Sequence, residues 1–337
     1  MTVQVGLIGA GRMGATLAHH LAFGVDTAVF TAISDPNWEA AQAVAQKCGV
    51  PRVYADYREM LARDDLDAVV IVTPTNTHVE VIKAAAAAGK HIFTEKPLAL
   101  TLAGCDEAIT AVETAGVKMM VGFMRRFDPS YRAAKEKIDA GLIGRPVMFK
   151  AVGRDPGRTS LEYARRENSG GLIADMGIHD FDLARWLMGS EVERVYSEGG
   201  CLVFPELAGV GDIDNAVINL KFTSGAVGNV DVSRNAVYGY DIRTEIIGSE
   251  GALFIGDLKN TSTVLLTRDG ALHDTMPGFM ARFPEAYAAE IADFVAAIES
   301  DRPVSITGTD ARAATAVALA ATISLDEERP VLLRELA

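Results

Sequence analysis

Short, mostly apolar runs alternate with longer amphipathic segments over the first third of the chain. A largely apolar run rich in Val and Ile is typical of a strand buried on both faces of a parallel sheet. The segments between the runs carry apolar residues at helical spacing. This alternation predicts a doubly wound parallel sheet covered by helices. The expected strands are 3–8, 28–34, 67–73, 90–94 and 117–123, and the expected helices are 12–23, 79–88 and 102–115.

The pattern changes after residue 126. Beyond a helix expected over 129–140, strand-like runs are separated by turn sequences, which predicts an antiparallel meander. Two alanine-rich amphipathic helices, 284–299 and 310–324, close the chain. We therefore predict an α/β protein with an N-terminal Rossmann domain over 1–125 and a C-terminal α+β domain, with a large and mostly antiparallel sheet, over 126–337. The expected strands of the second domain are 147–152, 192–199, 216–222, 226–233, 240–247 and 251–256.

Length and charge narrow the class of protein. The 337 residues fit two domains, since single cores usually stop growing near about 250–300 residues. The net charge of −13 argues against nucleic acid or an anionic membrane as partner, because both require clustered Lys and Arg. The N-terminus lacks a signal-peptide pattern, and no apolar run approaches the ~20 residues that span a bilayer. Three dispersed cysteines, Cys48, Cys105 and Cys201, predict neither disulfides nor a zinc site, so a cytoplasmic protein is expected.

A glycine-rich turn follows the first expected strand and opens the first helix. Gly9, Gly11 and Gly14 have the GxGxxG spacing that admits a pyrophosphate at a helix N-terminus, and Arg12 and Met13 lie between them. Asp35 ends the second strand, where a dinucleotide fold places the acid that binds the ribose hydroxyls. Its alternative role is to cap the helix that begins near Asn37. The expected cofactor is NAD rather than NADP, because a carboxylate repels a 2′-phosphate.

Other turns at the carboxyl ends of the strands should face the same crevice. They contain the TPTNTH sequence of residues 73–78 and the EKP sequence of residues 95–97. These positions supply the remaining candidate cofactor contacts, which are Thr73, Pro74, Asn76, His78, Glu95 and Lys96.

Three polar residues share a spacing in the second domain. Asp175, His179 and Asp182 fall at i, i+4 and i+7, so on a helix they lie on one face. Oxidation of an alcohol requires a base for its proton, which suits His179, with Asp175 orienting the ring. Lys96 would stabilise the developing negative charge on the oxygen. Metal binding by the three helix residues is a less favoured alternative, because no cysteine or second histidine clusters nearby, so no metal is expected.

GAGRMG, TPTNTH, EKP and GGLIADMGIHDFD together resemble the glucose-fructose oxidoreductase/inositol dehydrogenase/rhizopine-catabolism (Gfo/Idh/MocA) family over essentially the whole chain. VGFMRRFDPSY and YGYDIRTEIIGSEG look most like the bacterial inositol 2-dehydrogenases within it. The resemblance implies Lys96, Asp175 and His179 as the catalytic set, a cis peptide before Pro97, and a dimer or tetramer. It implies substrate contacts from Arg125, Asp182, and Tyr238 or Tyr240. Gly170-Gly171 and Gly153 depart from the inositol enzymes.

The function expected from these features is NAD-dependent oxidation of a secondary alcohol of a cyclitol or sugar, with myo- or scyllo-inositol as the leading substrates. A pyranose such as glucose is an alternative substrate. Two other classes stay open, an NAD-dependent glycoside hydrolase and a cofactor-sensing regulator without catalysis. The intact Lys96, Asp175 and His179 argue against the regulator.

Overall fold

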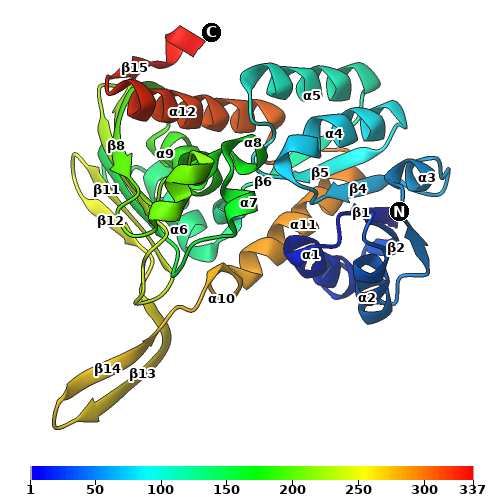
Figure 1. Ribbon diagram of the computed structural model, residues 1–337, viewed down its shortest axis with the longest axis horizontal. Coiled ribbons are helices and arrows are strands. Elements are labelled where there is room, and N and C mark those ends of the chain that lie inside the picture. The colour runs from blue at the N-terminus through cyan, green and yellow to red at the C-terminus, as the bar shows by residue number, and fades with distance from the viewer. Residues whose placement is uncertain (1, 337) are drawn as a thin grey trace. The chain divides into compact units, whose positions relative to one another are not determined.

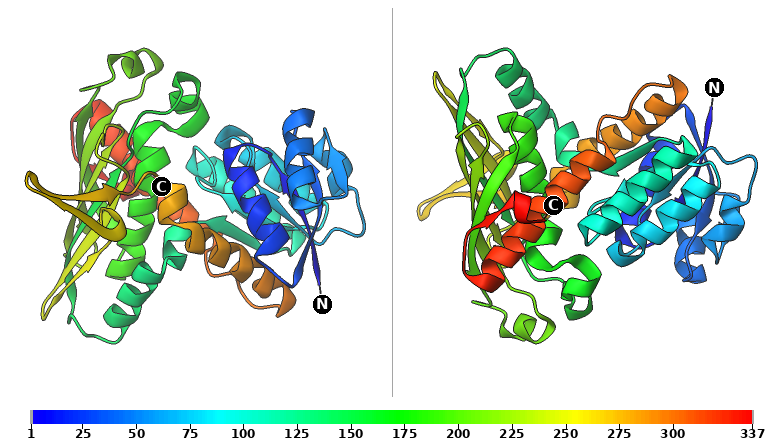
Figure 2. Two further views of the ribbon diagram at one scale, coloured as in Figure 1. Left: turned by 90° about the horizontal axis from the view of Figure 1, so that it is seen from below. Right: turned by 90° about the horizontal axis from the view of Figure 1, so that it is seen from above.

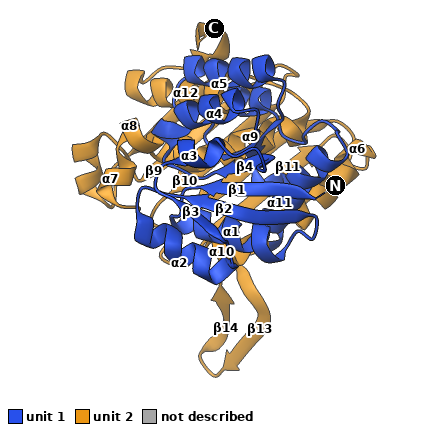
Figure 3. Cartoon of the chain, turned by 90° about the vertical axis from the view of Figure 1, so that its right-hand side faces the viewer, with its two compact units in different colours: residues 1–127, 285–313 blue, residues 128–284, 314–337 orange. Residues whose placement is uncertain are grey.

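The computed structural model describes residues 2–336, which form two compact units. Unit 1 comprises residues 1–127 and 285–313, and unit 2 comprises residues 128–284 and 314–337 (Figure 3). Each unit thus draws on two separate stretches of the chain. No helix among the described residues is long and apolar enough to cross a membrane.

Unit 1 contains a six-stranded parallel sheet in the order β3-β2-β1-β4-β5-β6. This order confirms the predicted Rossmann fold, and the first two strands and the first helix have the predicted bounds. The short strand β3 was not predicted, since three residues carry too little pattern. The strands are β1 (Val3–Ile8), β2 (Ala28–Ser34), β3 (Arg52–Tyr54), β4 (Ala68–Ile71), β5 (His91–Glu95) and β6 (Met119–Gly122).

Helices cover this sheet and begin at recognisable caps. Asn37 caps one helix through the Ala40 amide, and Thr101 caps another through the Gly104 amide. The elements are α1 (Arg12–Phe23), α2 (Trp38–Cys48), α3 (Tyr57–Leu61), η1 (Thr75–Thr77), α4 (His78–Ala87), α5 (Leu102–Ala115), η2 (Met124–Phe127) and α11 (Pro284–Glu299).

Helix α11 groups with unit 1, whereas the boundary predicted from the sequence, at residue 125, assigns it to the second domain. Phe294 of this helix stacks edge-on against Phe93 of β5, with ring centroids 5.9 Å apart. Farther along, the Ile306 carbonyl accepts a hydrogen bond from the Val121 amide of β6. Long-range packing of this kind leaves no mark in local periodicity. The next helix, α12 (Gly308–Glu327), begins in unit 1 and ends in unit 2.

Unit 2 contains a seven-stranded sheet in the order β12-β11-β7-β10-β9-β8-β15. The mostly antiparallel sheet is confirmed, but the meander was wrong, because β7 lies between β10 and β11 and pairs parallel with β10. Turn sequences identify hairpins, and they do not show that an earlier strand is inserted between two later ones. The strands are β7 (Pro146–Arg154), β8 (Val192–Gly200), β9 (Asn215–Phe222), β10 (Val227–Ser233), β11 (Asp241–Gly248), β12 (Ala252–Ile255) and β15 (Val331–Leu332).

Helices pack on one face of this sheet, and the other face is open (Figure 2). Along β9, Ile218 and Leu220 are buried, whereas Val217, whose side chain points to the opposite face of the sheet, is 42% exposed. The helical elements are α6 (Pro129–Asp139), α7 (Leu161–Ala164), α8 (Arg166–Ser169), the π-helical turn η3 (Ile173–Gly177), α9 (Ile178–Met188), η4 (Pro205–Val210), α10 (Phe279–Arg282) and η5 (Leu333–Leu336).

A two-stranded hairpin extends away from the large sheet of unit 2 (Figure 1). It consists of β13 (Lys259–Thr267) and β14 (Gly270–Thr275) and was not predicted. Leu265 and Leu266 of this hairpin are 59% and 76% exposed. It has no buried face, so the two-residue alternation that identifies a strand is absent from its sequence.

Candidate active site

The glycine turn between β1 and α1 separates structural from ligand-related glycines. Gly9 has φ +106°, and a Cβ there would lie 2.7 Å from the Val72 carbonyl oxygen. A Cβ on Gly14 would lie 2.0 Å from the Gly9 oxygen. A Cβ on Gly11 would meet nothing within 4 Å among the described residues. The fold therefore explains Gly9 and Gly14, whereas the open space at Gly11 fits a pyrophosphate that approaches the backbone.

The N-terminus of α1 is also suited to an anion. Its N-cap is Gly11, which has no side chain to cap the helix, so the first-turn amides are available to an anion. Arg12 is exposed and Met13 is half-buried at this turn. These features fit the phosphates of a dinucleotide.

Asp35 joins the glycine turn to the end of β2. Its Oδ2 accepts a hydrogen bond from the Ala10 amide at 2.6 Å, and its Oδ1 accepts one from the Asn37 amide at 2.7 Å. The N-cap of α2 is Asn37 itself. A carboxylate has about four acceptor positions, so these two amides leave Asp35 able to bind ribose hydroxyls.

His78 links two turns at the carboxyl edge of the sheet. Its Nδ1 lies 2.8 Å from the Pro97 carbonyl, and its Nε2 lies 2.9 Å from the Thr73 carbonyl. The ring is 1% exposed, and burial lowers the pKa of His78. A neutral ring donates one N–H, so it satisfies one carbonyl at a time. The structure thus places His78 beneath the turns rather than on their surface, where Pro74 and Asn76 are exposed.

The EKP turn follows β5 and contains two of the predicted residues. The peptide bond between Lys96 and Pro97 is cis, as predicted. Lys96 is half-buried, and its amide donates to the Glu95 carboxylate at 3.2 Å. Arg125, in η2, is 3% exposed.

A buried carboxyl pair lies behind this turn. Burial raises the pKa of Glu95 to about 7, although the positive charge of Lys96 acts in the opposite direction. Glu290 of α11 is fully buried, and neither of its carboxyl oxygens has a hydrogen-bond partner among the described residues. Burial and the nearby Glu95 hold the pKa of Glu290 well above its usual value. Burial thus favours the protonated form of both carboxyls.

The three predicted polar residues of unit 2 occupy one helical segment. Asp175 lies in the π-helical turn η3, whereas His179 and Asp182 lie in α9. His179 is 9% exposed and Asp182 is 1% exposed. The wider π turn was not anticipated, and such turns occur often at functional sites.

Asp175 is held by residues distant in sequence. Its Oδ1 accepts a hydrogen bond from the Tyr163 hydroxyl at 3.0 Å. Its Oδ2 lies 3.5 Å from Nη2 of Arg234, which also lies 3.4 Å from Oδ2 of Asp212. Sequence reasoning missed Tyr163, Arg234 and Asp212. An available signal was Arg234 itself, a charged residue at the end of an otherwise strand-like run.

Two glycine departures from the inositol enzymes have local causes. A Cβ on Gly153 of β7 would lie 2.8 Å from Oδ2 of Asp180, which is fully buried. A Cβ on Gly171, at φ +78°, would lie 2.8 Å from Oδ1 of Asp212. Both glycines make room for a buried carboxylate in this chain.

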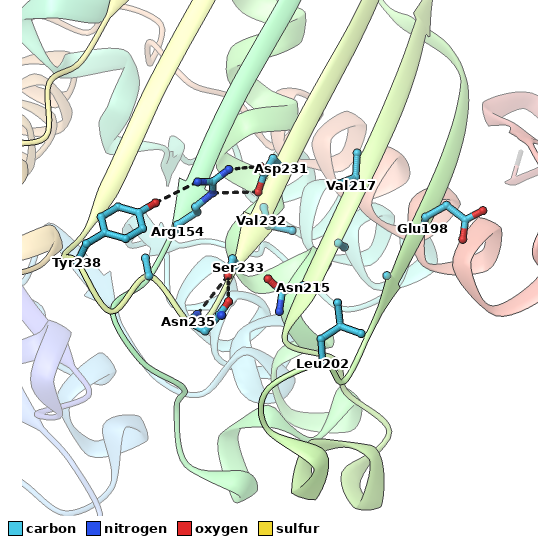
Figure 4. Close-up of a pocket in the computed structure, with 13 residues that line it drawn as sticks. Arg154, Glu198, Leu202, Asn215, Val217, Asp231, Val232, Ser233, Asn235 and Tyr238 are labelled. Carbon is cyan, nitrogen blue, oxygen red and sulfur yellow. Dashed lines mark hydrogen bonds and ion pairs between the residues drawn. The ribbon is translucent and has the colours of Figure 1, made fainter.

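The two candidate tyrosines lie in different surroundings. Tyr240 is buried and packs edge-on against Phe283, with ring centroids 6.4 Å apart. The Tyr238 hydroxyl donates to Asp241 at 2.9 Å and accepts from Arg154 at 3.0 Å. Tyr238 borders a pocket of about 550 Å³ on the open sheet face, where Arg154 also pairs with Asp231 (Figure 4).

No group of three or more His, Cys, Asp or Glu side chains in residues 2–336 is arranged to hold a metal ion. Asp175, His179 and Asp182 are therefore not assembled as a ligand set in this structure.

Family models match both units. The model described as an oxidoreductase family with an NAD-binding Rossmann fold matches residues 3–123, and the GFO/IDH/MocA C-terminal domain matches residues 131–254. Myo-inositol 2-dehydrogenase of Thermotoga maritima is 40% identical over 99% of both chains. The scyllo-inositol 2-dehydrogenase (NAD(+)) of Bacillus subtilis is 41% identical over 98% of this chain and 96% of the relative.

A solved structure agrees with these sequence matches. Scyllo-inositol dehydrogenase of Lactobacillus casei, with bound NAD(H) and scyllo-inositol, has a TM-score of 0.94 and 31% identity, and the match covers 99% of this chain and 100% of the other. Fold, glycine turn and matches together define an NAD-dependent oxidoreductase. The chain belongs to the Gfo/Idh/MocA family.

Proposed function

We propose that this protein is an inositol 2-dehydrogenase that oxidises a secondary alcohol of myo- or scyllo-inositol to the corresponding inosose. Two kinds of observation support the proposal. The full-length relatives carry these activities in their names. The observation that carries it within this chain is the network that joins Asp175, one helical turn before His179, to the buried Arg234 and to Tyr163.

NAD, when bound, supplies the nicotinamide that takes up the hydride. In the proposed reaction, His179 accepts the hydroxyl proton, and the Asp175 carboxylate stabilises the resulting imidazolium. Lys96 donates a hydrogen bond to the same oxygen and stabilises its negative charge as it develops. The proton thus leaves the alcohol to His179 while the carbon loses hydride.

The proposed cofactor contacts come from unit 1. The amides of the glycine turn take the pyrophosphate and Asp35 takes the ribose, so NAD is favoured over NADP. The other proposed contacts are Arg12, Met13, Thr73, Pro74, Asn76, His78, Glu95 and Lys96. Because His78 is buried between two carbonyls, its proposed contribution is to hold the turns that carry Thr73 and Lys96.

Arg125, Asp182, Tyr238 and Tyr240 are the proposed substrate contacts. Inositol offers a ring of hydroxyls, so charged donors and acceptors can distinguish its stereoisomers by hydrogen bonding. Tyr240 and Tyr238 are not equivalent, since only the latter is exposed, at 41%.

A substrate panel tests the proposal. The purified protein is mixed with NAD or NADP and with myo-inositol, scyllo-inositol, glucose or a sugar acid, and nicotinamide absorbance is followed. We expect reduction of NAD with an inositol at the highest kcat/KM. A higher kcat/KM with glucose would make the protein a pyranose dehydrogenase. Glycoside cleavage without net NAD reduction would favour the hydrolase.

We further propose that the open sheet face of unit 2 forms the subunit interface of a homo-oligomer. Val217, Val227 and Phe254 expose apolar side chains from three strands of this sheet, at 42%, 43% and 78%. Exposed apolar side chains gathered on one face indicate an interaction surface, whereas single scattered ones do not. Light scattering of Val217→Glu should give a smaller assembly than the wild type and than Leu142→Glu, a control at another exposed apolar site. Equal masses would exclude this face.

A further inference from the structure

Arg234 is among the largest fully buried side chains of the molecule, and it is charged. The residue directly follows β10, and its side chain is 1% exposed. A guanidinium does not lose its proton in proteins, so it must be compensated by negative groups where it is buried. The compensating groups lie on Asp175 and Asp212, at 3.5 Å and 3.4 Å from the same Nη2 atom.

Asp212 is fixed independently of Arg234. Its Oδ1 accepts a hydrogen bond from the Leu172 amide at 2.7 Å, just before the turn that carries Asp175. Gly171 permits this approach, because any side chain there would meet Oδ1 of Asp212. The side chain of Asp212 is 2% exposed. The carboxylate therefore anchors the start of the catalytic segment and places a second negative charge beside Asp175.

The charges do not cancel within this group. Two carboxylates face one guanidinium in surroundings where water contributes little screening. Burial raises the pKa of Asp212, the Arg234 charge opposes that rise, and the Asp175 charge adds to it. Without Arg234, two carboxylates would compete for one proton.

We infer that Arg234 is a positioning residue of the proposed dehydrogenase: it keeps Asp175 ionised beside Asp212, so that Asp175 can stabilise the His179 imidazolium. The inference rests on the proposed function and extends it to a residue that acts only through another. It assigns a purpose to Gly171, which leaves room for Asp212 to balance the buried guanidinium.

The sign of the expected pH effect follows from the charges. Removing a positive charge raises the pKa of every nearby acid, so Asp175 takes up a proton at a higher pH in an Arg234 variant. Neutralising Asp212 removes a negative charge and has the opposite effect. The titratable and charged groups to be considered are Tyr163 of α7, Arg166 of α8, Asp212 after η4, Arg234 after β10, and Asp180, Asp182 and His179 of α9.

The experiment compares kcat against pH for myo-inositol oxidation in wild type, Arg234→Gln, Asp212→Asn and the double variant. We expect Arg234→Gln to move the acid limb upward by about one pH unit or more, with KM little changed. Asp212→Asn keeps the oxygen that accepts from the Leu172 amide, and we expect the double variant to return the limb toward wild type. Arg234→Lys should retain the wild-type limb, because it keeps the charge.

Controls separate this role from folding and from the proposed function. Arg185→Gln, which breaks the ion pair between Arg185 of α9 and Glu191 just beyond that helix, should leave the limb in place. An unmoved limb in Arg234→Gln, or a double variant no better than the single, would overturn the inference while leaving the dehydrogenase intact. Near wild-type kcat in Asp175→Asn would overturn the inference and the proposed role of Asp175 while leaving the dehydrogenase intact. No NAD reduction by wild type with any inositol would overturn the proposed function and the inference together.

Discussion

The glycine turn of unit 1 and the Asp175 network of unit 2 are held in their geometry by different means. The turn is built from backbone: Gly9 and Gly14 are required by close contacts, and one carboxylate, Asp35, holds it. The network is built from side chains contributed by separate elements, with Arg234 at its centre. A backbone site is therefore sensitive to steric change, whereas the side-chain site is sensitive to the balance of charge.

The largest effect is expected at the two residues proposed to act on the reacting oxygen, Lys96 of unit 1 and His179 of unit 2. Lys96→Ala and His179→Ala should each lower kcat by about 10² to 10⁴, the range for positioned acid–base groups, with NAD affinity little changed. Steady-state kinetics and NAD titration measure this. The exposed residues Lys83 and His273 provide matched alanine controls. Turnover near wild type in either active-site variant would remove that residue from the mechanism.

The two regions also differ in how much of them could be predicted. GxGxxG and Asp35 lie within one strand–helix–strand unit, so their spacing alone predicts the turn. Asp175, His179 and Asp182 were found by helical spacing, since they too are neighbours in sequence. Tyr163, Asp212 and Arg234 approach Asp175 from three separate parts of the chain. They lie in a helix after β7, in the segment between η4 and β9, and directly after β10. No local period records such contacts.

Glu290 illustrates the same limit in unit 1. On an alanine-rich helix it has the pattern of a surface residue, yet α11 packs into unit 1 and buries it completely. Glu95, the carboxyl that raises its pKa, is almost 200 positions earlier in the chain. The motif predicted the EKP turn, and only the fold brings a second carboxyl behind it.

The next largest effect concerns cofactor choice at the backbone site. Asp35→Ser should weaken NAD by about 1.5–3 kcal/mol, because charge-assisted hydrogen bonds to the ribose are lost. It should improve NADP by removing a negative charge. The kcat/KM of both cofactors in wild type, Asp35→Ser and the exposed control Asp26→Ser measures this. Wild-type preference for NADP would contradict the assigned role of Asp35.

A steric test within the turn separates fold from ligand. Gly14→Ala places a Cβ against the Gly9 oxygen and should lower the free energy of unfolding by about 1–3 kcal/mol. Gly11→Ala enters open space, so its Tm should stay near that of wild type while NAD binding weakens. Thermal unfolding without NAD, followed by NAD titration, distinguishes the two. Unchanged NAD affinity in folded Gly11→Ala would show that the pyrophosphate does not approach there.

The smallest effect concerns the pH dependence of stability in unit 1. A carboxyl whose pKa is raised by folding contributes stability below its unfolded pKa, and that contribution is lost as pH rises through the folded pKa. Glu95, with its pKa raised to about 7, and Glu290 should therefore make Tm fall between about pH 5 and about pH 8. Glu290→Gln removes the ionisable group whose pKa is raised by burial and by the nearby Glu95, so its Tm should fall less over this range. Glu299→Gln, at an exposed position of the same helix, should follow wild type. If Glu290→Gln and wild type lost stability equally, deprotonation of Glu290 would not contribute to the fall in Tm.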